Sequence, residues 1–70
     1  MNQCELVMKY INDFGSITTF EAFTELGITR LGSRIHDLTN QGVNFKREIL
    51  SKKNRYGKSV SFTRYSLEVE

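Results

Sequence analysis

Apolar residues recur at helical spacing near the start of the chain. The repeating positions are Cys4, Val7, Ile11 and Phe14. Intervals of three, four and three residues place these side chains on one side of an α-helix. Gly15 follows directly, and glycine often adopts the left-handed conformation that ends a helix. The spacing predicts a first helix over residues 3–14, with Phe14 on its buried face.

The next segment has the pattern of a helix start. Thr18 and Glu21 stand three positions apart, as in a capping box, where each side chain bonds to the other residue's backbone amide. Residues 16–18 are short and β-branched, which fits either a brief strand or a plain connection. We expect a second helix that runs through Leu26. Its predicted apolar face consists of Phe20, Phe23 and Leu26, with Ala22 as a small contact.

A tight turn at residues 27–28 separates this helix from a third one. Thr29 is well suited to be its N-cap, and Gly42 ends it. The predicted buried stripe is Leu31, Ile35 and Leu38. Gly32 lies inside this helix, although glycine there costs about 1 kcal/mol relative to alanine. Either close packing against another helix or the turn backbone, or close approach of a phosphate chain, would explain it.

The hydrophobic period changes to two after the third helix, as in a half-buried β-strand. The alternating apolar residues are Val43, Phe45 and Ile49. Residues 51–58 then form a turn with four cations and no acid, and a second strand covers residues 59–67. The apolar residues of this second strand change sides after Phe62, because Val60 and Phe62 share one face whereas Tyr65 and Leu67 share the other. Either a β-bulge near residues 63–64 restores the pattern, or Phe62 is exposed on the hairpin.

This order of elements predicts an α+β fold of the winged helix-turn-helix type. Three helices precede a two-stranded β-hairpin wing, and residues 16–18 could add a short third strand. The chain has 70 residues, so we expect a single domain over residues 1–70. A domain of this size buries only about 60% of its unfolded surface. A deep catalytic pocket is hard to build from so short a chain.

Charge is distributed unevenly along the chain. Residues 1–28 hold one lysine and four acids, a net charge of −3. Residues 29–67 hold nine lysines and arginines against two acids, a net charge of +7. A domain with one basic side is typical of nucleic-acid binding. Mixed surface charge that only maintains solubility is the alternative.

Side chains for DNA recognition are expected on the third helix and on the wing. Residues near the start of a recognition helix reach base edges, and cations on a wing neutralise phosphates. The candidate residues are Thr29, Arg30, Ser33, Arg34, Asn40, Lys52, Lys53, Arg55 and Lys58. Arg34 and Asp37 are three positions apart, so they could instead form an ion pair on the helix surface. Arg30 is therefore the stronger candidate for a DNA contact.

Other chemistry finds little support in the sequence. Cys4 is the only cysteine, so neither an internal disulfide nor a cysteine zinc site can form. His36 has no second ligand nearby in sequence. His36 and Asp37 point about 100° apart on a helix, which excludes a triad with Ser33. We expect no catalytic residue, metal or cofactor.

Residues 15–42 carry a motif that resembles a family of small phage and prophage helix-turn-helix domains. The pattern of that family is G-x-I-T-x-x-E-A-x-x-x-L-G-I-x-R-L-x-x-R-I-x-D-L, followed by a glycine and a hairpin that ends in an aromatic residue and a leucine. This sequence matches each fixed position from Gly15 to Leu38, and its hairpin ends in Tyr65 and Leu67. The resemblance implies a winged helix-turn-helix that binds DNA in a phage-infected or lysogenic bacterium.

The expected function is therefore that of a DNA-binding protein, either a phage transcriptional regulator or a DNA-architecture factor. The third helix, about residues 30–41, would enter the major groove of double-stranded DNA, and the basic wing would contact the backbone. The alternative is a phage module that docks on a host protein and modulates it. A homodimer or a cooperative neighbour could extend the footprint. The first residues lack a long apolar run, which predicts a cytoplasmic protein without a membrane partner.

Overall fold

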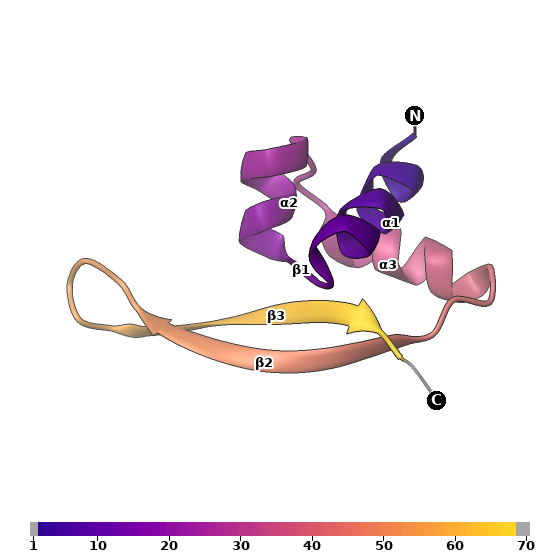
Figure 1. The fold of residues 1–70 in the computed structure, drawn as a ribbon. Helices are drawn as coiled ribbons and strands as arrows, with labels where there is room; N and C mark the ends of the chain where they lie inside the picture. Colours follow the sequence, from indigo (N-terminus) through magenta and orange to yellow (C-terminus); the bar gives the residue numbers. More distant parts are fainter. Residues whose placement is uncertain (1, 69–70) are drawn as a thin grey trace.

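The computed structural model describes residues 2–68 and contains three helices and three strands. In chain order the elements are α1 (Gln3–Phe14), β1 (Ile17–Thr18), α2 (Thr19–Leu26), α3 (Leu31–Asn40), β2 (Phe45–Lys53) and β3 (Ser59–Leu67). The helices lie along one side of β3, and the β2–β3 hairpin extends beyond them (Figure 1). The predicted α+β order is confirmed. The expected domain range of 1–70 includes residues 1, 69 and 70, which lie outside the described residues.

Helix α1 has the predicted bounds and one unexpected exposed ring. The side chain of Asn2 accepts a hydrogen bond from the Glu5 amide at 2.8 Å and caps the start. Gly15 has a φ of 88°, and its amide donates to the Ile11 carbonyl. The prediction that Phe14 is buried is wrong, because its side chain is 71% exposed. Its ring instead lies against Tyr10, with 4.6 Å between the centroids.

Helix α2 has the predicted start but a different buried face. Thr18 and Glu21 form the expected capping box. The side chain that α2 buries completely is Ala22, whereas Phe20 is 70% and Phe23 is 58% exposed. A small alanine lets the helix backbone come close to the core. Because residues two apart point about 200° apart on a helix, burying Ala22 turns Phe20 outward. The predicted burial of Phe20 and Phe23 is therefore wrong, whereas Leu26 packs against the core as predicted.

Helix α3 buries the predicted stripe but begins later than expected. Its N-cap is Arg30, without a side-chain capping bond, so the prediction that Thr29 caps this helix is wrong. The helix ends at Asn40, and Gly42 lies just beyond it with a φ of 99°. The Gly42 amide bonds to Thr39 and the Val43 amide to Leu38. These two bonds form a Schellman motif, which requires a left-handed residue at this position.

The three strands form an antiparallel sheet in the order β1-β3-β2. Residue Ile17 of β1 pairs with Tyr65, so the third strand that the sequence left open is present. β2 and β3 pair residue for residue from Phe45↔Leu67 to Lys53↔Ser59. The bulge near residues 63–64 is therefore wrong. Phe62 is half-buried rather than fully exposed.

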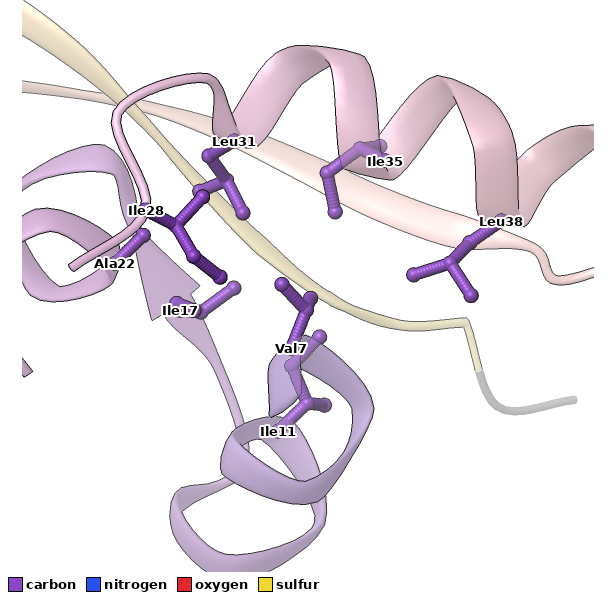
Figure 2. Packing of buried hydrophobic residues seen from close by; sticks show 8 residues of the cluster. All are labelled: Val7, Ile11, Ile17, Ala22, Ile28, Leu31, Ile35 and Leu38. Atoms are coloured by element: carbon purple, nitrogen blue, oxygen red, sulfur yellow. The ribbon is translucent and has the colours of Figure 1, made fainter. Parts of the chain in front are cut away.

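The hydrophobic core lies between the helices and the root of the hairpin. Its buried members are Val7, Ile11, Ile17, Ala22, Ile28, Leu31, Ile35 and Leu38. Figure 2 shows the α3 side chains pointing toward those of α1 and β1. Phe45, Tyr65 and Leu67 pack against this cluster from the hairpin. Ile49 does not reach it and is 71% exposed, so its predicted burial is wrong.

Candidate nucleic-acid interface

The outward side of α3 is polar and uncrowded. Arg30 and Asn40, at the two ends of the helix, are exposed, and Ser33 is half-buried. Arg30 holds the first turn through its carbonyl, which accepts bonds from the Ser33 and Arg34 amides. The first turn contains no acid. Donors and acceptors are thus available along one face, with Arg30 at the start.

Arg34 points toward α1 rather than away from the body. One guanidinium nitrogen, Nη1, donates to Gln3 Oε1 at 3.3 Å. The other, Nη2, lies 3.1 Å from Asp37 Oδ2, so the predicted ion pair forms. The Nε atom is buried and has no partner among the described residues. The guanidinium therefore links α3 to α1.

Gly32 faces open space on α3. A Cβ atom added at this position would meet no heavy atom within 4 Å outside the local helix backbone and chain neighbours. The residue is exposed. The interpretation that another helix or the turn packs against Gly32 is therefore wrong. Close approach of a phosphate chain, the other interpretation, stays a prediction.

The four predicted wing cations occupy the far end of the hairpin. Lys52 and Lys53 are the last residues of β2, not turn residues as predicted, and Arg55 lies in the turn. Lys58 immediately precedes β3. All four are exposed. Because neighbouring strand residues point to opposite faces, Lys52 and Lys53 present charge on both sides of the wing.

Asn54 shapes the turn that carries these cations. Its side-chain oxygen accepts bonds from the Tyr56 amide at 2.9 Å and from the Lys58 amide at 3.1 Å. Its own amide donates to the Lys58 carbonyl at 2.8 Å. Gly57 has a φ of 79°, which suits the reversal of the chain. The turn is thus fixed by local bonds while its cations extend outward.

Further cations, which were not among the residues predicted to bind DNA, lie nearer the root of the wing. Lys46 and Arg47 are exposed on β2, and the Arg47 guanidinium lies 5.7 Å from the centre of the Tyr65 ring. Arg64 forms an ion pair with Glu48 across the two strands. The high cation content of residues 43–64 could have pointed to Lys46 and Arg47. The predicted alternation of Val43, Phe45 and Ile49 gave neither of these cations a role in binding.

The acidic half of the chain lies on α1 and α2. Glu21 accepts from the Thr18 amide and from the Tyr10 hydroxyl, at 3.0 and 3.1 Å. Desolvation, and then the hydrogen bond and negative charge of Glu21, raise the pKa of the Tyr10 hydroxyl above its ordinary value. Lys9 and Asp13 form an exposed pair. Several of these charges are thus already used within the fold.

Within residues 2–68 no group of three or more histidine, cysteine or carboxylate side chains could hold a metal ion. Over the same residues, no helix is long and apolar enough to cross a membrane.

A family model described as a winged helix-turn-helix domain matches residues 2–70. The chain belongs to this family. No curated protein and no solved structure gives a significant match. The three helices and antiparallel sheet agree with the family's fold. Winged helix-turn-helix domains typically bind DNA rather than catalyse reactions, and membership supports a general DNA-binding role for this chain.

Proposed function

We propose that this protein binds double-stranded DNA with α3 in the major groove and the wing on the adjacent backbone. The observation that supports this most strongly is the wing end, where Lys52, Lys53, Arg55 and Lys58 project far from the core without an acid among residues 51–58. Phosphate contacts of this kind give affinity and register. The protein would act by occupying its site, as a phage transcriptional regulator or a DNA-architecture factor in the bacterial cytoplasm.

We assign base contacts first to Arg30, then to Ser33 and Asn40. Arginine can pair bidentately with guanine and asparagine with adenine. Thr29 would lie near the backbone just before the helix. Arg34 is already bound by Gln3 and Asp37, so its main contribution would be to fix α3 on α1.

The footprint of one such module is small, so a specific site requires more than one copy. We propose that residues 1–70 act as a single unit and bind as a homodimer or next to a cooperative neighbour. Single DNA-binding modules bury about 600–1,000 Å² of protein surface, whereas typical specific complexes bury more. The exposed polar face of α3 would then read one half-site per copy.

The salt dependence of duplex binding tests this proposal. The wild type and a Lys52→Ala, Lys53→Ala, Arg55→Ala triple variant are titrated with labelled random-sequence duplex at several salt concentrations. Each phosphate contact contributes roughly −0.9 to the slope of log affinity against log salt. We expect the triple variant to flatten the slope by about 2.7 when all three contacts are made.

Two single variants distinguish a specific contact made by α3 from a general effect of positive charge on DNA binding. Arg30→Ala should weaken binding, most clearly on DNA that flanks the protein's own gene. Lys9→Ala removes the same charge from the acidic half, where Lys9 pairs with Asp13, and should leave binding unchanged. If neither Arg30→Ala nor the triple variant changes duplex affinity, the proposed function is wrong.

A further inference from the structure

An apolar groove lies between α2 and the distal part of the wing. It has a volume of about 520 Å³. Six of the residues that line it are Phe20, Phe23, Thr29, Lys52, Val60 and Phe62. Phe20, Phe23 and Val60 are 70%, 58% and 45% exposed. Figure 1 shows α2 above the part of the hairpin that begins to extend past the helices. Contiguous exposed apolar surface of this kind marks interaction sites.

Packing within the described fold does not account for these rings. α2 contacts the core through Ala22, and neither Phe20 nor Phe23 belongs to the core cluster or its partly buried rim. On the wing, Leu50 pairs with Phe62 and Lys52 pairs with Val60. Directly paired side chains share a face of the sheet. Of these four residues, Phe62, Val60 and Lys52 line the groove, so the wing presents two apolar side chains and one cation to the two rings of α2.

The charge around the groove is positive. Lys52 is the one charged residue among its lining residues. The nearest acid on the same face of the hairpin, Glu48, is paired with Arg64. Of the two acids of α2, Glu21 has its two oxygens bonded to the Thr18 amide and the Tyr10 hydroxyl. The other, Glu25, lines a separate pocket against α1. An occupant therefore meets phenylalanine rings and an uncompensated lysine.

We propose that this groove binds an acidic amphipathic segment of a partner protein. Apolar side chains of the segment pack against Phe20, Phe23 and Phe62, and a carboxylate pairs with Lys52. This interaction goes beyond DNA binding and does not depend on it. Amphipathic helices commonly dock into hydrophobic grooves in this way.

Two other occupants fit the charges less well. In a two-fold dimer through this groove the same patch meets itself, so two copies of Lys52 come into one interface. A single nucleic-acid strand carries a phosphate at every nucleotide and requires cations along its path. The groove offers one lysine among its lining residues. A negatively charged, largely apolar peptide matches both the phenylalanine rings and the single lysine of the groove.

Fluorescence anisotropy with a synthetic helix tests the proposal. The probe has about 18 residues, five turns of helix, with leucines on one face and glutamates on the other. We expect saturable binding to the full chain and at least tenfold weaker binding to Phe23→Ser. Lys52→Glu should reverse the preference toward the same peptide with lysines in place of glutamates.

Phe14→Ser is the matched control, because Phe14 is also a largely exposed phenylalanine, at 71% against 58% for Phe23, but lies on α1 away from the groove lining. It should leave peptide binding unchanged, and thermal unfolding checks that each variant folds. Phe23→Ser should also keep wild-type affinity for duplex DNA, which separates this test from that of the DNA-binding function.

Three results would overturn the assignment. Equal affinity for the glutamate and lysine peptides excludes an acidic partner. Displacement of the glutamate peptide by a single-stranded oligonucleotide identifies a nucleic-acid groove instead. Sedimentation that shows a dimer in the wild type and a monomer in Phe23→Ser identifies a second copy as the occupant.

Discussion

The helical body, residues 3–40, and the wing, residues 45–67, differ in how many of their side chains are buried. The body contains every residue of the buried core, from Val7 to Leu38. The wing contributes only half-buried contacts at its root, and all of residues 51–61 are exposed. The body therefore holds most of the packing that stabilises the fold. The wing is held mainly by its strand ladder, which leaves its outer side chains free to carry charge.

This difference teaches that the packing that stabilises the fold is concentrated in the core of the body, whereas the residues proposed for binding lie at the surface of both parts. A substitution in the buried core should change unfolding, whereas one in the outer wing should change binding and leave unfolding nearly unchanged. The division can be tested with pairs of similar substitutions placed on either side of it.

The largest difference is expected between two isoleucines. Ile35→Ala removes a side chain that is 1% exposed, and such cavities cost about 2–5 kcal/mol. Native domains are stable by about 0.05–0.15 kcal/mol per residue, which is about 3.5–10.5 kcal/mol for a chain of this length, so this variant should lose a large share of its stability. Ile49→Ala, at a position 71% exposed, should change the free energy of unfolding by less than about 0.5 kcal/mol. Urea titrations followed by circular dichroism measure both. Similar losses for the two variants would contradict the division.

A smaller effect is expected from the helix cap inside the body. Thr18→Ala removes the capping bond to the Glu21 amide and should lower the free energy of unfolding by about 1 kcal/mol. Thr24→Ala is the matched control on the same helix. Thr24 is exposed, and its hydroxyl bonds back to the Phe20 carbonyl, so this variant should be neutral or slightly stabilising. Equal destabilisation by the two variants would mean that the cap has no particular role.

A change of no more than about 1 kcal/mol, in the stabilising direction, is expected at Gly32, where a body residue faces outward. Since a Cβ atom there meets open space, Gly32→Ala should raise the free energy of unfolding by about 0.5–1 kcal/mol. If a phosphate chain approaches this position, the same variant should bind duplex DNA more weakly. Thermal unfolding and duplex titration on one preparation test both effects. Unchanged duplex affinity would show that DNA does not come close to Gly32.

The sequence predicted the parts of this fold that depend on short-range physics. Helix bounds followed from caps and glycines, as at Thr18, Glu21 and Gly15. The buried stripe of α3 could be predicted because its three apolar residues, Leu31, Ile35 and Leu38, lie on one side of the helix. The basic wing could be predicted because residues 51–58 contain four cations and no acid. Each of these features depends on neighbours within a few positions, so the printed sequence contains the necessary information.

The tertiary structure decided which apolar side chains meet the core and how the functional residues are oriented. α2 contains phenylalanines and an alanine, and close packing selected the alanine, which left Phe20 and Phe23 at the surface. The continuous pairing of β2 with β3 determined the side of the wing for Phe62 and Lys52. The packing of α1 against α3 determined that Arg34 reaches Gln3. Local pattern can mark a side chain as apolar or charged, but its partner depends on the distant segment that the fold brings beside it.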